Sequence, residues 1–146
     1  MPSAAATRPD AALAGSLRDA IGRIGRRLRA ERAPSDLSLG QWAALRTLDS
    51  HGPMTPSELA AHEKVQPPSM TKIVANLESH GYITRTPDPG DRRQVVVAAT
   101  PAGRAFLADD RRRRDKWVSQ RLAALDPADR AALAAALPAL EKLSRS

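Results

Sequence analysis

The spacing of apolar residues predicts helices over most of the chain. Near the N-terminus, apolar positions recur every three or four residues, which is the period of one helical face. Pro34 ends this first helix by about Arg32, because proline does not fit a helix interior. Residues 1–10, before the stripe, are expected to form a disordered tail. The stripe consists of Leu13, Leu17, Ile21, Ile24 and Leu28.

Capping residues predict three further helices in the middle of the chain. Ser38 and Gln41 have the spacing of a capping box, in which each side chain bonds the other residue's backbone N–H. Thr55 and Glu58 repeat that spacing, with a proline at the first helical position. Two prolines at 67–68 fit only the start of another helix. These signals predict helices after Ser38 and over about 56–62 and 68–79, the last of them ended by Gly81.

The pattern then changes to that of strands. Residues 82–86 and 94–99 are β-prone, and the turn between them ends in two arginines. We therefore expect a β-hairpin. Two more helices follow, one from Pro101 to about Leu125 and one that opens at Asp126.

This order of elements predicts a mainly α fold of the α+β type. A short helix, a tight turn and a second helix with polar outward residues form a helix-turn-helix, and the hairpin after it supplies a wing. We expect a winged helix-turn-helix DNA-binding domain over 36–100, flanked by helical segments at 11–35 and 101–146. The segment 131–140 is nearly all apolar. A terminal helix of that kind needs a partner, and a second copy of the chain is the simplest one.

Charge and composition narrow the classes of partner. The chain has 23 Lys and Arg against 16 Asp and Glu, a net charge of +7 in 146 residues. Such an excess of positive charge indicates a polyanionic binding partner, for which nucleic acid is the first candidate and an anionic membrane surface the second. A GC-rich genome would produce the same bias toward arginine. Without cysteine the chain forms no disulfide and no thiolate metal site. Apolar runs stay shorter than the roughly 18 residues that span a bilayer, so we expect a cytoplasmic protein with no membrane partner.

The predicted second helix of the motif starts with residue types that read base edges or hold phosphates. In the wing, Arg92 and Arg93 are placed to enter the minor groove, where negative potential concentrates. Asp91 is expected to brace the Arg93 guanidinium through a bidentate pair. The candidate residues on the recognition helix are Pro68, Ser69, Thr71, Lys72 and Asn76.

No catalytic or metal-binding set stands out. His62 and Glu63 open a pattern typical of zinc proteases, but Gln66 stands where the second histidine is required. We find no nucleophile–histidine–acid set, no paired carboxylates and no phosphate-binding glycine loop. We therefore expect no enzymatic activity, no metal and no cofactor.

The chain resembles the MarR family of bacterial winged helix-turn-helix transcriptional regulators, and most of all its actinobacterial members. The resemblance covers about 12–143. It rests on the start of the motif at 54–60, the recognition helix and strand at 68–83, the wing at 88–93 and the segment at 99–103, where Ala99 replaces the usual leucine.

The resemblance implies a homodimeric repressor, associated with the nucleoid, in which each winged domain reads half of a palindromic operator. It also implies a pocket for a small aromatic or phenolic effector that releases the DNA, with Trp42 as a candidate contact. Two other classes stay open: an architectural protein that binds DNA without sequence preference, and a helical protein that docks its last helix on another protein. The first helix and the last two would form the dimer interface through Leu13, Leu17, Ile21, Leu133, Leu137 and Leu140.

Overall fold

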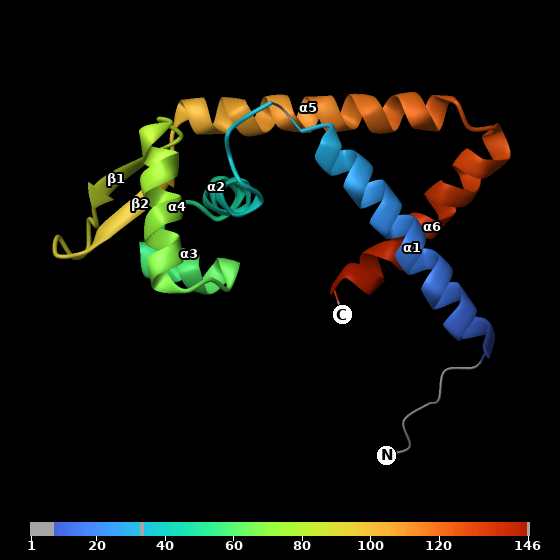
Figure 1. The fold of residues 1–146 in the computed structure, drawn as a ribbon, viewed down its shortest axis with the longest axis horizontal. Helices are drawn as coiled ribbons and strands as arrows, with labels where there is room; N and C mark the ends of the chain where they lie inside the picture. The colour runs from blue at the N-terminus through green and yellow to red at the C-terminus, as the bar shows by residue number, and fades with distance from the viewer. Residues whose placement is uncertain (1–7, 33, 146) are drawn as a thin grey trace, which may run out of the picture. The chain divides into compact units, whose positions relative to one another are not determined.

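A computed structural model describes residues 8–32 and 34–145 of the chain. The chain divides into two compact units, and each is described by itself. The winged unit is Ala33–Arg111, and the helical unit consists of Met1–Arg32 and Arg112–Ser146. The elements in order are α1 (Arg8–Ala30), α2 (Leu39–His51), α3 (Pro56–Glu63), α4 (Pro67–Ser79), β1 (Ile83–Pro87), β2 (Val95–Ala99), α5 (Pro101–Ala123) and α6 (Pro127–Arg145) (Figure 1).

Both capping boxes form as predicted. The Gln41 N–H donates to the Ser38 hydroxyl at 3.2 Å, and the Ser38 N–H donates to the Gln41 side chain at 2.9 Å. Thr55 and Glu58 make the same reciprocal pair at the start of α3. Each box satisfies N–H groups that a helix start otherwise leaves without a partner. Gly81, with φ of 73°, follows α4 in the left-handed conformation that glycine adopts without steric cost.

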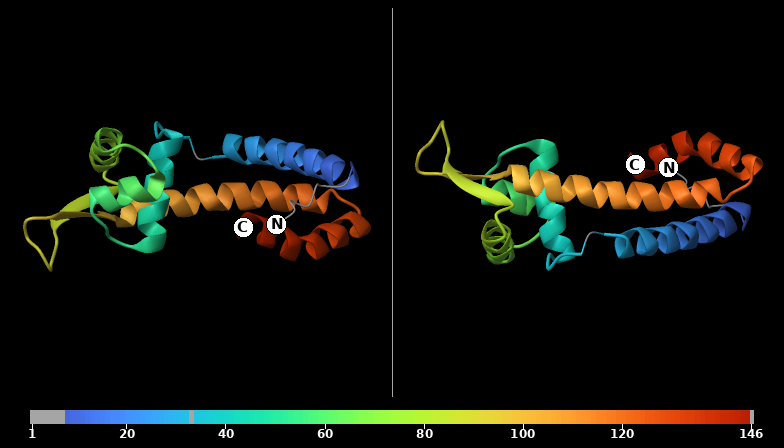
Figure 2. Two further views of the ribbon diagram at one scale, coloured as in Figure 1. Left: turned by 90° about the horizontal axis from the view of Figure 1, so that it is seen from below. Right: turned by 90° about the horizontal axis from the view of Figure 1, so that it is seen from above.

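The winged unit has one apolar core, built from one face of each of its elements. The hairpin pairs β1 antiparallel to β2 with Ile83 opposite Ala99, and Met54 forms a single further bridge to Val97. Figure 2 shows the hairpin tip extending away from the helices of this unit. The core therefore fixes α4 and the base of the hairpin on one frame. Its most deeply buried apolar side chains are Leu45, Leu48, Leu59, Met70, Val74, Leu77 and Val97.

The first part of α5 belongs to the winged unit. Gly103 lies so close to the hairpin that a Cβ there would stand 2.3 Å from the carbonyl oxygen of Tyr82. The Thr100 N–H donates to that same carbonyl at 2.9 Å. Leu107 and Asp110, farther along the helix, are buried. The compact unit thus runs to Arg111, beyond the boundary at residue 100 that the sequence suggested.

The helical unit lacks a buried core of its own. No described residue of α1 or α6 is buried. Large apolar side chains are exposed on both helices, among them Leu13, Ile21, Leu133 and Leu137. Monomeric proteins rarely expose large contiguous apolar patches, and scattered exposed apolar residues are normal.

Part of the expected tail at 1–10 is helical instead. Residues 8–10 form the first turn of α1, where a proline is tolerated and where the Asp10 carboxylate suits the positive end of the helix dipole. Residues 1–7 lie outside the described part of the chain. Over the described ranges, no helix is both long enough and apolar enough to cross a bilayer.

Candidate nucleic-acid interface

Helix α4 presents one face to the core and the other to solvent. Met70, Val74 and Leu77 are buried. This arrangement leaves Pro68, Ser69, Thr71 and Lys72 exposed on the opposite side, toward the start of the helix. Thr71 donates its hydroxyl hydrogen to the Pro67 carbonyl at 3.1 Å, so its oxygen stays available as an acceptor. Four of the five predicted recognition-helix residues therefore share one exposed surface.

The start of α4 offers few backbone donors. Pro67 and Pro68 have no N–H, and the N–H groups of Ser69 and Met70 both donate to the Gln66 carbonyl, at 3.0 and 3.1 Å. Gln66, the N-cap residue, makes no side-chain capping bond. Helix starts commonly hold phosphate through unpaired N–H groups. Here, contacts to an anion must come from the side chains of Ser69, Thr71 and Lys72.

Asn76 is less exposed than the other four predicted residues. It is half-buried, and its side-chain oxygen is buried with no hydrogen-bond partner. The side chains of Ser79 and His80 both bond the Asn76 backbone carbonyl, at 2.7 and 2.8 Å. A contact from Asn76 to DNA stays a prediction.

The wing tip is held by two aspartates that accept bonds from the backbone. Asp88 accepts the Gly90 N–H and Asp91 accepts the Arg93 N–H, each at 3.0 Å. The predicted bidentate pair between Asp91 and the Arg93 guanidinium is wrong: the carboxylate holds the main chain instead. Arg92 and Arg93 are both exposed, and neither forms an ion pair with another described residue. Asp91 therefore shapes the loop, while both arginine side chains stay available to a ligand.

Two contacts that sequence spacing did not reveal position these elements. Arg85 on β1 donates to Glu78 at 2.8 Å, which ties the end of α4 to the hairpin. The Thr47 hydroxyl bonds Glu63, which ties α2 to the end of α3. Neither pair lies within one helix or across one turn, so no local pattern predicts it.

Trp42 anchors α2 to α5 inside the winged unit. Its indole N–H donates to a carboxylate oxygen of the fully buried Asp110 at 3.1 Å. The Arg46 guanidinium lies over the indole ring, 4.9 Å from its centre. Trp42 therefore joins α2 to α5 through its hydrogen bond to Asp110. A contact between Trp42 and an effector stays a prediction. Asp110 was not among the residues singled out from the sequence.

The positive charge of the chain is not in the winged unit. That unit has eight Lys and Arg against nine Asp and Glu, a net charge of −1. The helical unit has fifteen against seven, a net charge of +8. The overall excess that indicated a polyanionic partner therefore comes from the helical unit rather than from the winged unit.

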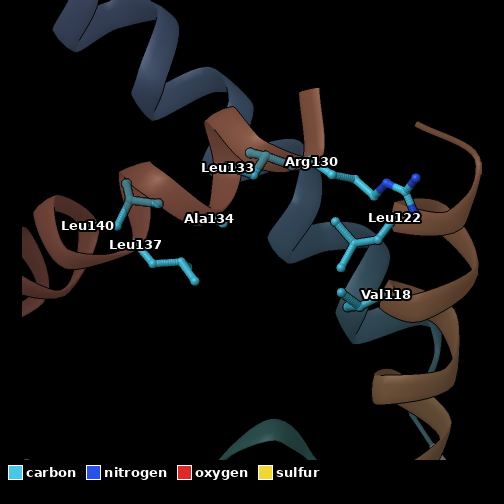
Figure 3. Close-up of a pocket in the computed structure, with 7 residues that line it drawn as sticks. All are labelled: Val118, Leu122, Arg130, Leu133, Ala134, Leu137 and Leu140. Carbon is cyan, nitrogen blue, oxygen red and sulfur yellow. The ribbon is translucent and has the colours of Figure 1, made fainter. Parts of the chain in front are cut away.

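In the helical unit, three of the six residues predicted for dimerisation, Leu133, Leu137 and Leu140, line an apolar cavity of about 330 Å³. Figure 3 shows side chains of α5 and α6 that line it. Leu13, Leu17 and Ile21 lie on α1 and do not line this cavity. The lining residues are Val118, Leu122, Arg130, Leu133, Ala134, Leu137 and Leu140.

The arrangement of α3, α4 and the hairpin on one core defines a winged helix-turn-helix. Comparison with known proteins agrees, because a sequence profile of the MarR family matches residues 37–95. The uncharacterized HTH-type transcriptional regulator Mb0904 of Mycobacterium bovis is 43% identical to this chain over 121 residues. The match covers 83% of this chain and 85% of that protein. The chain belongs to the MarR family of transcriptional regulators, and its relatives are regulators and not enzymes.

Solved structures extend the likeness to nearly the whole chain. The crystal structure of a candidate transcriptional regulator from Pseudomonas aeruginosa PA01 has a TM-score of 0.86 and 34% identity, and covers 97% of this chain and 99% of that one. BpsR of Bordetella bronchiseptica, whose DNA binding is regulated by 6-hydroxynicotinic acid, has a TM-score of 0.60 and 23% identity, over 91% and 93% of the two chains. At 23% identity, the likeness to BpsR shows a shared fold alone.

Proposed function

We propose that this protein is a homodimeric repressor that binds a palindromic operator and releases it when a small molecule binds. The observation that carries the proposal is the shared frame of the recognition helix and the wing. Ser69, Thr71 and Lys72 are exposed on α4, and Arg92 and Arg93 are exposed at the tip of the adjoining hairpin. One frame thus presents base-reading and phosphate-binding groups for the major groove and cations for the minor groove.

The dimer is supported by the exposed apolar residues of the helical unit. A second copy that packs against Leu133, Leu137 and Leu140 would remove from water a surface that α1 and α6 leave uncovered. A symmetric dimer would carry two recognition helices, which matches a palindromic site with half-sites about one helical turn apart.

Release by an effector is proposed by analogy with BpsR, which shares the fold and whose DNA binding is regulated by 6-hydroxynicotinic acid. We propose an aromatic or phenolic effector for this chain as well, with Trp42 as one contact. A repressor of this kind would act on the nucleoid in the cytoplasm.

The test is a fluorescence-anisotropy titration at about 150 mM salt. It compares the DNA upstream of the protein's own gene with a scrambled duplex of equal length. A preference of about 10³ or more supports a sequence-specific regulator. Arg93→Ala is expected to cost about 1–3 kcal/mol of operator binding. An unchanged affinity would remove the wing from the interface.

The alternative is an architectural protein that binds DNA without sequence preference, and the net charge of +8 on the helical unit favours it. It predicts nearly equal affinity for both duplexes and a steep dependence on salt. Binding to neither duplex would favour a protein that docks its last helix on another protein.

A further inference from the structure

Helix α1 has a continuous arginine face opposite its apolar stripe. At 100° per residue, Arg23, Arg26, Arg27 and Arg29 cover about half of the helix circumference, and the stripe from Leu13 to Leu28 covers the other side. All four arginines are exposed. We refer to these four residues as the arginine face.

The arginine face carries charge that the chain does not neutralise. Arg18, the neighbouring arginine, pairs with Asp19 at 3.1 Å. Within the part of the chain that the structure describes, none of the four arginines of the face forms an ion pair. An unpaired run of cations on one helix repels itself, so a bound polyanion would stabilise it.

The spacing of the face suits phosphates. Arg23 and Arg29 lie about 9 Å apart along the helix axis, and phosphates of one DNA strand recur about every 3.4 Å along the duplex axis. Guanidinium groups also bind phosphate oxygens in a bidentate way. A face of that length spans the axial rise of about three phosphates, so its guanidinium groups are able to contact the DNA backbone without reading any base.

A membrane surface fits this helix less well. Amphipathic helices that lie on a bilayer bury an apolar face that typically includes Trp or Phe, and α1 has no aromatic residue. Its apolar stripe is also the side that the proposed dimer would cover, whereas the arginine face would remain outside.

We propose that the arginine face of α1 is a second surface for duplex DNA, which binds phosphates without sequence preference and acts separately from α4 and the wing. The winged unit has a net charge of −1, so it does not by itself supply the long-range attraction that draws a protein to DNA. The helical unit supplies that attraction, and α1 is where its unpaired cations are concentrated. The winged unit then selects the sequence.

The experiment measures the affinity for a labelled 20-base-pair duplex of random sequence at several salt concentrations between about 50 and 200 mM. The variant R23Q/R26Q/R27Q removes three cations from the arginine face. The matched control K116Q/K142Q/R145Q removes three exposed cations from α5 and α6 that do not line the apolar cavity, so the net charge changes equally. Glutamine keeps the helix propensity of arginine.

We expect the α1 variant to lose at least about tenfold in affinity near 100 mM salt. Its slope of log affinity against log salt should fall by about 2–3, since each lost phosphate contact removes roughly 0.9. The matched control should change by less than about twofold. R23K/R26K/R27K, which keeps the charge, should keep the wild-type slope. If the triple glutamine variant does not fold, Arg26→Gln alone carries the test, and its slope should fall by about 0.9.

The proposal is overturned if the α1 variant binds like wild type, or if both triple variants lose the same affinity, because total charge alone would then be responsible. It is also overturned if the α1 variant loses binding only to vesicles that contain an anionic lipid.

A third variant, K72A/R93A, separates this proposal from the repressor function. It should lose preference for the operator while it keeps the random duplex within about threefold.

Discussion

Gly103 is the residue at which the winged unit has no space for a side chain. A Cβ at this position would lie 2.3 Å from the Tyr82 carbonyl oxygen and 3.1 Å from a Leu45 methyl group. Backbone atoms cannot yield as a flexible side chain does. We therefore expect Gly103→Ala to lower the free energy of unfolding by about 2–3 kcal/mol, measured by urea denaturation.

Gly40 provides the matched control for this substitution. It lies in the first turn of α2, and a Cβ there would meet only ordinary contacts, the nearest at 3.7 Å from Ile73. Gly40→Ala should be neutral or stabilising by up to about 1 kcal/mol. Equal effects of the two substitutions would show that the close approach of α5 to the hairpin does not limit stability.

The hydrogen bond from Trp42 to Asp110 leads to a second prediction for a single residue. Trp42→Phe keeps most of the ring packing but removes the N–H that donates to a fully buried carboxylate. We expect a loss of about 2 kcal/mol in the free energy of unfolding. Trp117→Phe makes the same chemical change at a half-buried ring and should cost less than about 1 kcal/mol. A loss at Trp42 no larger than that at Trp117 contradicts the anchoring role.

At the scale of the element, the wing distinguishes two roles for Asp91. Asp91→Asn and Asp91→Ala each remove one negative charge, but only asparagine keeps an oxygen that can accept the Arg93 N–H. If the carboxylate acts through the backbone, operator affinity should be weaker for alanine than for asparagine by about 0.5–1.5 kcal/mol. Anisotropy titrations of both variants measure this difference. If asparagine is as weak as alanine, the charge matters, and a pair with the guanidinium would be required.

The helices and strands could be predicted from the sequence because their signals are local. Each of these signals is made by residues that lie within a few positions of one another in the sequence. This holds for both capping boxes, for the helix stop at Gly81 and for the buried stripe of Met70, Val74 and Leu77. The exposed start of α4 follows from that stripe, since the opposite face of a half-buried helix must point to solvent.

The contacts that fix these elements could not be predicted in the same way. Trp42 and Asp110 are 68 residues apart, and Arg85 meets Glu78 across the junction of a helix and a strand. Asn76 is half-buried although helical periodicity places it away from the buried stripe, and periodicity alone does not describe what surrounds the end of a helix. The location of the charge, by contrast, could be read from the sequence, since a count over 36–100 also gives −1.

At the scale of the whole molecule, the two units differ in how they are stabilised. The winged unit encloses fifteen buried apolar residues, one of which is Leu107 on α5, whereas α1 and α6 bury none among their described residues. A helical pair with that much exposed apolar surface gains stability from association, because water is then removed from the same leucines. The helical unit is therefore the part of the chain whose stability should depend on protein concentration.

Leu137 tests this dependence directly, because it is 56% exposed on α6 and lines the apolar cavity. A carboxylate placed there would have to be buried without a partner when a second copy covers the surface. We expect wild type to scatter light as a particle of roughly twice 15.7 kDa, and Leu137→Asp to be a monomer at micromolar concentration.

Leu39 is the control for this substitution, since it is 57% exposed but lies on α2 in the winged unit. Leu39→Asp makes the same change at the same exposure and, in the first turn of a helix, suits the dipole. It should leave the dimer intact. If both variants stay dimeric, α6 lies outside the interface; if both become monomeric, the interface includes the winged unit. Only a loss confined to Leu137→Asp assigns the association to the exposed leucines of α6.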